Sequence, residues 1–367
     1  MRELTWEQVR ARRLQRSYLT QRAPAERLVE VVREVGGIHA QVTAAAELQL
    51  AARVDGITHA EVREALWERR ELAKSWTLRG TLHIHPADEL SLWTAARAAV
   101  VSEIDYVVDG VEHVPDIVEA IGAALRGRRL LREELADAVA ERVENAPRAQ
   151  LASGWGYYLA DAAQAGVLCF GPPQGAKVTF VHTEDWLGPQ PVWEPREALR
   201  EVARRYVAAY GPATHRAFRD WFTARGFKPA DAEDVFAELD LVEVRVAKRR
   251  AWLLEDEEPV RPTPTVRLLP EYDVYVMGFR ERDEFVPPAV REQIRAHGKG
   301  RYEGPSATPF LLVDGVCAGV WRRRKTTKRI ELAVEPAREL TAAERAGVET
   351  EAERIGAFLG LEPLLTI

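Results

Sequence analysis

Gly36-Gly37-Ile38-His39-Ala40-Gln41 follows a helix-like run from Ala25 to Val35 and places two polar side chains directly after a glycine pair. Paired glycines end helices, because glycine adopts left-handed backbone conformations without a steric penalty. In extended chain the side chains alternate, so His39 and Gln41 are expected on one side and Ile38 and Ala40 on the other. In a continued helix the two polar side chains would lie about 200° apart. The glycines therefore allow an imidazole and a carboxamide to face one small group together.

A structural interpretation of the same stretch stays open. Buried polar side chains are almost always hydrogen-bonded, so His39 and Gln41 could serve only to satisfy the backbone of a loop. The spacing of the two residues does not by itself separate this interpretation from a catalytic one.

The sequence around and after this stretch predicts three sets of helices, each followed by a β-hairpin. The first set has helices at residues 5–19, 25–35, 42–53 and 58–69, with strands at 71–78 and 81–85 joined near Arg79-Gly80. Thr5 with Gln8 predicts a capping box at the first helix. The second set has helices at 115–125, 132–143 and 156–165 and strands at 167–170 and 177–182, and the third has helices at 194–210, 214–225 and 229–239 and strands at 241–247 and 251–254. A hairpin after such helices is typical of the wing of a winged helix.

The remainder of the chain follows a proline-rich joint at residues 259–264. Strands are expected at 266–269, 272–277, 310–313, 316–323 and 328–334, and a helix at 341–359 is expected to close the chain. The predicted fold class is α+β, with three tandem winged helix-turn-helix units followed by a β-rich C-terminal portion. The expected boundaries are 1–110 for the first unit, 111–190 for the second, 191–258 for the third and 265–367 for the β-rich portion.

Composition sets broader limits. The 367 residues are enough for two or three cores, and 46% hydrophobic with 29% charged residues is typical of a soluble globular protein. Cys169 and Cys317 lie far apart without a CxxC motif, so neither a disulfide framework nor a zinc site is indicated. The sequence contains no signal-peptide core and no run of about 18 apolar residues, which favours a cytoplasmic protein that does not span a membrane.

The net charge of −6 argues against a general nucleic-acid coat, but one segment is strongly basic. Residues 322–329 contain no acid, and Lys248-Arg249-Arg250 forms a second, smaller basic cluster. Basic clusters of this kind are often solvated turns, and they can also bind phosphates. The candidate phosphate-binding residues of the segment are Arg322, Arg323, Arg324, Lys325, Lys328 and Arg329.

Other chemistry-bearing residues favour structural roles. Thr81, His83 and His85 alternate along one expected strand and Asp88 follows, but no cysteine or third histidine nearby completes a metal-ligand pattern, so no metal site is predicted. Glu271 and Asp273 resemble paired carboxylates, yet a turn at the start of a strand explains them equally well. The aromatic residues at 155–158 could stack on a base, although aromatic side chains at helical spacing are more often core. The common nucleotide-binding, hydrolase and zinc-protease signatures are absent.

The motifs together resemble the AlkZ-like winged helix-turn-helix DNA glycosylases, the bacterial family that includes YcaQ and the azinomycin-resistance enzyme. Members carry a Gly-Gly turn and then a polar-apolar-polar triplet, most often Gln-x-Gln or Gln-x-Asp, that holds the attacking water. Here the triplet is His39-Ala40-Gln41, so histidine replaces the commoner glutamine. The further matches, in family order, are Arg79-Gly80-Thr81-Leu82-His83, Gly166-Val167-Leu168-Cys169-Phe170-Gly171, Leu268-Leu269-Pro270-Glu271-Tyr272-Asp273, Val313-Asp314-Gly315 and Gly319-Val320-Trp321-Arg322.

This resemblance implies a monofunctional DNA glycosylase that hydrolyses the N-glycosidic bond of alkylated purines, in DNA repair or antibiotic self-resistance. The catalytic residues would be His39, as the base that accepts a proton from water, and Gln41, which orients that water. No lysine replaces the first triplet residue, so a Schiff-base lyase step is not indicated. The partner would be double-stranded DNA carrying N7-alkylguanine, bulky natural-product adducts or crosslinks. The protein would act as a monomer without a cofactor, and Arg79 would add to the DNA-binding residues of the basic segment.

Two alternatives remain at this stage. A catalytically silent winged helix DNA-binding protein or regulator would bind DNA with a steep salt dependence but release no base. An interaction scaffold that does not bind DNA is also compatible with the acidic net charge. Formation of abasic sites in alkylated duplex DNA separates both from the glycosylase.

Overall fold

The computed structural model describes residues 2–100, 114–154, 156–222, 227–255, 257–278, 282–297 and 307–367. Their elements form two compact units. Unit 1 contains both ends of the chain and consists of Met1–Val62, Arg204–Trp221 and Leu239–Ile367, and unit 2 consists of Arg63–Ala203 and Phe222–Glu238. His39, Gln41 and the basic segment at 322–329 therefore belong to unit 1, whereas Arg79 belongs to unit 2.

The helices of the N-terminal part of unit 1 form where the local sequence signals predict them. Its elements are β1 (Arg2–Leu4), α1 (Trp6–Arg16), α2 (Leu28–Glu34), β2 (Ile38–His39) and α3 (Thr43–Ala51). The capping box of α1 is present, because Thr5 Oγ1 accepts from the Gln8 backbone N–H and Gln8 Oε1 accepts from the Thr5 backbone N–H. Gly36 and Gly37 have φ values of 75° and 93°, which end α2 and turn the chain into the extended β2.

A small sheet in unit 1 joins segments far apart in the sequence. The hairpin of β8 (Val242–Val246) and β9 (Arg249–Leu253) is predicted correctly, and β1 adds to it as a parallel partner of β8. Leu4, Val9, Val244 and Leu253 bury their side chains in the core of this sheet. The β1 strand was not predicted, because its three residues carry too little pattern.

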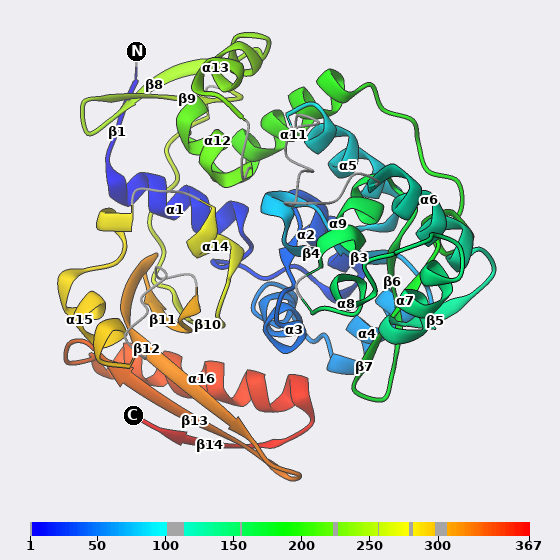
Figure 1. Cartoon of the computed structure of the whole chain (residues 1–367). Helices are drawn as coiled ribbons and strands as arrows, with labels where there is room; N and C mark the ends of the chain where they lie inside the picture. Colours follow the sequence, from blue (N-terminus) through cyan, green and yellow to red (C-terminus); the bar gives the residue numbers. More distant parts are fainter. Residues whose placement is uncertain are drawn as a thin grey trace. The chain divides into compact units, whose positions relative to one another are not determined.

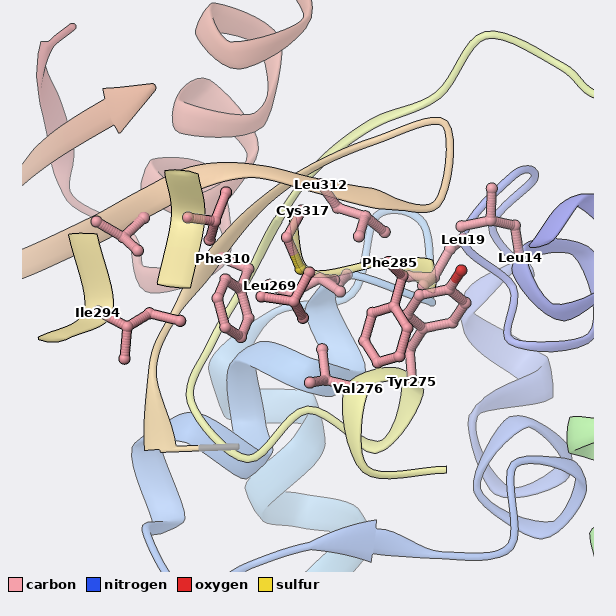
Figure 2. Packing of buried hydrophobic residues seen from close by; sticks show 14 residues of the cluster. Leu14, Leu19, Leu269, Tyr275, Val276, Phe285, Ile294, Phe310, Leu312 and Cys317 are labelled. Atoms are coloured by element: carbon pink, nitrogen blue, oxygen red, sulfur yellow. The ribbon is translucent and has the colours of Figure 1, made fainter. Parts of the chain in front are cut away.

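The C-terminal part of unit 1 is a five-stranded sheet in the order β10-β11-β12-β13-β14. Its strands are β10 (Val266–Leu269), β11 (Phe310–Val313), β12 (Val316–Lys325), β13 (Arg329–Pro336) and β14 (Glu362–Thr366), and its helices are α14 (Val274–Met277), α15 (Pro288–His297) and α16 (Ala342–Leu359). Helix α16 packs along this sheet against β10 and β14 (Figure 1). Figure 2 shows the core beside the sheet, where Leu269, Phe310 and Cys317 of the strands meet Tyr275 and Val276 of α14.

Two expectations for this region are wrong. Residues 272–277 were predicted as a strand, but residues 274–277 form α14. Asp273 caps this helix by accepting from the Tyr275 backbone N–H, and the Gln49 side chain accepts from the Val274 N–H. A short apolar run suits a strand or a helix equally well. The contact with Gln49, which is remote in sequence, therefore helps to select the helix. Helix α16 does not close the chain, because β14 follows it and pairs in parallel with β13. Helix α15 was not predicted.

Unit 2 contains helices and two hairpins. Its elements are β3 (Leu72–Trp76), β4 (Leu82–Pro86), α5 (Leu90–Ala98), α6 (Val114–Leu125), β5 (Arg129–Leu131), α7 (Arg132–Ala140), α8 (Arg148–Leu151), α9 (Tyr157–Gln164), β6 (Cys169–Gln174), β7 (Lys177–Val181), α10 (Thr183–Leu187) and α13 (Pro229–Ala237). The helices α4 (His59–Trp67), α11 (Pro195–Tyr210) and α12 (His215–Phe222) each begin in one unit and end in the other. Strands β3 and β4 pair antiparallel, as do β6 and β7, and the unpredicted β5 adds to β7.

The α+β class is confirmed, and the three expected hairpins are present. The assignment of the helices and hairpins to winged helix-turn-helix units and the four domain boundaries stay predictions. The boundary near residue 110, the end of the expected helix at 214–225 and the candidate stacking residue Trp155 lie outside the described residues. Tyr158 is buried in α9, as expected for a core aromatic. Among the helices of the described ranges, none combines the length and apolarity that crossing a membrane requires.

Candidate active site

His39 lies in a loop that is held at both ends. The Tyr210 hydroxyl donates to the Val35 carbonyl at 2.7 Å, just before the two glycines. On the other side, Gln49 Nε2 of α3 donates to the His39 carbonyl at 3.0 Å. The His39 side chain is buried, whereas Gln41 is exposed. The two triplet residues thus combine a buried imidazole on a restrained backbone with a carboxamide at the surface.

The imidazole of His39 stacks on the ring of Tyr272. The ring centroids are 4.9 Å apart and the planes are inclined by 26°. Tyr272 is half-buried and has a left-handed backbone, with φ of 60°. A stacked neighbour covers one face of an imidazole and leaves the nitrogen atoms at the ring edge to hydrogen bonding.

A buried ion pair fixes the residue after Tyr272. Arg53, at the end of α3, donates from its two terminal nitrogens to the two carboxylate oxygens of Asp273 at 2.8 and 2.7 Å. Both side chains are completely buried. Gln49 adds a second link, because its Oε1 accepts from the Val274 N–H at 3.2 Å while its Nε2 holds His39. One glutamine side chain therefore ties the His39 loop to the start of α14.

A second ion pair fixes the residue before Tyr272. Arg323 of β12 donates from both terminal nitrogens to the carboxylate of Glu271, at 2.7 and 2.9 Å. Its guanidinium also lies 5.7 Å from the ring centroid of Trp321. Trp321 Nε1 in turn donates to the Leu269 carbonyl at 2.8 Å. The candidate DNA-binding residue Arg323 is thus connected to His39 through Glu271 and Tyr272. Glu271 and Asp273, expected in a structural turn, form ion pairs within one.

The other arginines of the basic segment pair with acids that the segment's own sequence does not contain. Arg322 pairs with Glu335, and Arg329 pairs with Glu362 at 2.9 Å. Arg324 lies 3.9 Å from Glu331. Lys325 and Lys328 are exposed, and within the part of the chain that the structure describes neither forms an ion pair. Fewer positive charges are uncompensated than the sequence of the segment indicates.

Arg79 and the histidines of β4 form a separate set of contacts in unit 2. Arg79 occupies a tight turn with φ of 58°, and its guanidinium donates to His83 Nε2 at 3.3 Å. His83 Nδ1 then donates to the Thr81 carbonyl at 3.1 Å. His85 Nε2 lies 2.8 Å from Thr77 Oγ1, and its ring stacks on Trp93. These contacts give both histidines structural partners.

Among the described residues, no three His, Cys, Asp or Glu side chains gather closely enough to hold a metal ion. Cys169 and Cys317 are both buried as free thiols. Burial in apolar surroundings raises the pKa of the Cys169 thiol to about 12, so this thiol is not activated as a nucleophile.

Three residues around His39 were given no role from the sequence: Gln49, Arg53 and Tyr272, of which Tyr272 was quoted only as part of a family motif. Gln49 and Arg53 carried a signal, because a polar and a charged residue on an otherwise alanine- and leucine-rich helix are costly to bury without partners. Their partners are far away in the sequence: Val274 lies 225 residues after Gln49, and Asp273 lies 220 residues after Arg53. The sequence alone does not indicate that pairing.

Comparisons with known proteins identify the family of the chain. The family model described as DNA glycosylase AlkZ-like matches residues 32–358. A Streptomyces sahachiroi protein described as an interstrand DNA cross-link repair glycosylase is 31% identical over 389 residues, covering 98% of each chain. The structure of Streptomyces sahachiroi DNA glycosylase AlkZ matches with a TM-score of 0.81 and 28% identity, over 100% of both chains. The similarity thus covers nearly the whole chain, and the chain belongs to the AlkZ-like DNA glycosylase family.

Proposed function

We propose that this protein is a monofunctional DNA glycosylase that removes alkylated purines, N7-alkylguanine above all, from double-stranded DNA. The observation that carries the proposal is the His39-Ala40-Gln41 triplet behind the Gly36-Gly37 turn, in a chain that belongs to a glycosylase family. Contacts from Gln49 and Tyr272 support the proposal, because they restrain His39 before any substrate binds. Restraint of this kind lowers the entropic cost of reaching a reactive geometry.

The proposed reaction is hydrolysis at C1′ of the damaged nucleotide. The bond between C1′ and N9 breaks, and its electron pair neutralises the positive charge of the N7-alkylated purine, which leaves as a neutral base. A water molecule bonds to C1′, and its proton moves to His39 while the Gln41 carboxamide orients it. General-base assistance contributes roughly 10²- to 10⁴-fold to a rate. That is enough for an activated leaving group and leaves normal bases intact.

The range of substrates is proposed more widely than simple methylation. The Streptomyces sahachiroi relative is described as acting on interstrand crosslinks. Bulky natural-product adducts and crosslinks at guanine N7 share the cationic leaving group, so we include them in the proposed substrate class. We also propose that the three helix and hairpin sets are winged helix-turn-helix units. Lys325, Lys328 and the arginines of the basic segment, with Arg79, would contact DNA phosphates.

The test uses a duplex oligonucleotide with one N7-methylguanine, incubated with excess protein. Wild-type protein is expected to produce abasic DNA that breaks only after alkali or heat. His39→Ala and Gln41→Ala should each slow single-turnover excision strongly, by roughly 10²- to 10⁴-fold for His39. Both should leave DNA affinity close to wild type, because neither role requires a phosphate contact. A crosslinked duplex analysed on a denaturing gel tests unhooking in the same way.

The control reactions use the same duplex without protein, which measures spontaneous depurination, and an undamaged duplex with protein. Strand breakage by the protein alone would identify a lyase rather than a monofunctional glycosylase. DNA binding without release of any N7 adduct would instead support the catalytically silent DNA-binding protein. A His39→Ala variant that excises at the wild-type rate would return the triplet to a purely structural role.

A further inference from the structure

Tyr272 has an unfavourable backbone conformation beside His39. A left-handed conformation is strained for any residue but glycine, because the Cβ approaches the following carbonyl oxygen. Its φ of 60° would suit glycine, yet the residue carries a large aromatic ring. Such a conformation persists only where the surroundings enforce it, and it occurs most often at functional sites.

The surroundings enforce it from both sides. Glu271 is held by Arg323 through two hydrogen bonds, and Asp273 is held by Arg53 through two more. Paired bonds of this kind fix orientation as well as distance, since the guanidinium and the carboxylate are both planar. With its two neighbours fixed to different elements, Tyr272 has little freedom to change its backbone. From this restrained backbone the Tyr272 ring stacks on the imidazole of His39.

The stack restricts the plane of the imidazole. A nitrogen lone pair of an imidazole lies in the ring plane, so the plane decides in which direction the ring can accept a proton. The backbone of His39 is fixed by Gln49, but a backbone contact does not prevent rotation of the side chain about χ2, which is a broad torsion in histidine. The Tyr272 ring, 4.9 Å away and nearly parallel, restricts that rotation.

We propose that Tyr272 is a positioning residue that holds the His39 imidazole in the plane needed to accept a proton from the attacking water. This inference rests on the proposed function and assigns a third residue to it, beside His39 and Gln41. The ring contributes through its face, so its hydroxyl group is dispensable. Phenylalanine should replace it, whereas a residue without a ring should not.

The experiment compares Tyr272→Phe with Tyr272→Gly. Glycine adopts the left-handed conformation without strain, so Tyr272→Gly removes the ring and preserves the path of the chain. Single-turnover excision of N7-methylguanine should stay within about twofold of wild type in Tyr272→Phe and fall roughly tenfold in Tyr272→Gly. DNA affinity should stay close to wild type in both. Tyr18, whose φ is 56°, provides the matched control, and Tyr18→Gly should excise like wild type.

A second measurement does not depend on excision. The chain has eight histidines, whose ring signals can be observed by proton or carbon-detected NMR. The signals of His39 are identified as those that are lost in His39→Gln. Stacking on an aromatic ring displaces those signals through the ring current. The displacement should persist in Tyr272→Phe and disappear in Tyr272→Gly.

The outcomes separate this inference from the function on which it rests. An active wild-type protein with an equally active Tyr272→Gly variant would overturn the positioning role alone, as would identical His39 signals in wild type and Tyr272→Gly. Weaker DNA binding by Tyr272→Gly, at an unchanged rate from the bound state, would make Tyr272 a DNA contact instead. A wild-type protein that excises no N7 adduct would overturn the proposed function itself.

Discussion

The buried ion pair of Arg53 and Asp273 affects both the stability of unit 1 and the geometry around His39. Burying one charge alone is very costly, and the bidentate contact offsets that cost only while both partners are present. Arg53 Nη1 also donates to the Gln49 carbonyl at 3.0 Å, so the pair supports the residue that holds His39. The pair therefore links the stability of unit 1 to the geometry around the imidazole.

Replacement of Arg53 by methionine should destabilise the protein by about 3–5 kcal/mol, because it leaves the Asp273 carboxylate buried without its partner. The measurement is the free energy of unfolding in urea. Arg329→Met is the matched control, since the Arg329–Glu362 pair is largely exposed and such pairs contribute about 0–1 kcal/mol. Equal losses in the two variants would show that burial does not set the value of the Arg53–Asp273 pair.

At the scale of elements, α16 shows how a helix boundary is specified locally. Thr341 Oγ1 accepts from the Glu344 backbone N–H at 3.2 Å, and Glu344 Oε2 accepts from the Thr341 N–H at 2.8 Å. Arg338 donates to both carboxylate oxygens of Glu344 at 2.8 and 2.6 Å. Bonding to Arg338 and to the cap lowers the pKa of Glu344 to about 2 from an ordinary value of 4.5.

Loss of this cap should cost about 1 kcal/mol in Thr341→Ala, because one backbone N–H of the first turn loses its acceptor. Thr350→Ala is the matched control on the same helix. Thr350 bonds only to the carbonyl one turn earlier, so its replacement should be close to neutral. Thermal unfolding of the two variants beside wild type measures the difference. A cap variant as stable as the Thr350 variant would contradict the role of the capping box.

The stability that Glu344 contributes at this cap depends on pH. The folded-state pKa of Glu344 lies below its unfolded value, so its contribution is present above about pH 4.5 and is lost as the pH falls toward about 2. The contribution itself is modest, because the Arg338 side chain with which Glu344 pairs is half-exposed to solvent. Glu344→Gln should therefore be less stable than wild type at neutral pH and approach it in acid.

At the scale of the whole molecule, the net charge of −6 and the proposed binding of DNA appear opposed. The distribution of charge resolves the conflict only in part. Four arginines of the basic segment lie beside carboxylates, at Glu335, Glu271, Glu331 and Glu362. Lys325 and Lys328, exposed near the tip of the β12–β13 hairpin, are the most available cations of that segment.

Replacing both lysines by alanine should weaken DNA binding and reduce the magnitude of the log-log salt slope by about 1.8, since each phosphate contact contributes about 0.9. Titrations of labelled duplex DNA at several salt concentrations provide the slope. The double change of the exposed Lys177 and Lys228, which lie outside both basic clusters, to alanine removes the same charge elsewhere and should leave the slope nearly unchanged. A slope unaffected by the hairpin changes would place the DNA path away from the hairpin.

The sequence by itself determined the features that depend on a few neighbouring residues. The glycines after α2, the capping box at Thr5 and the hairpins at β3–β4, β6–β7 and β8–β9 were predicted correctly, since each is encoded by residues close together in the sequence. The family motifs also identified the AlkZ-like family, which the comparisons confirm. The roles of His39 and Gln41 stay predictions.

Only the tertiary structure decided what lies around His39. Residues 274–277 are equally suited to a strand or a helix, and the contacts of Gln49 with Val274 and Arg53 with Asp273 select the helix. The stack of Tyr272 on His39 joins residues 233 positions apart by their numbers, and no local pattern encodes such a pairing. Burial forces Gln49, Arg53 and Asp273 to find partners, but the path of the chain determines which partners are within reach.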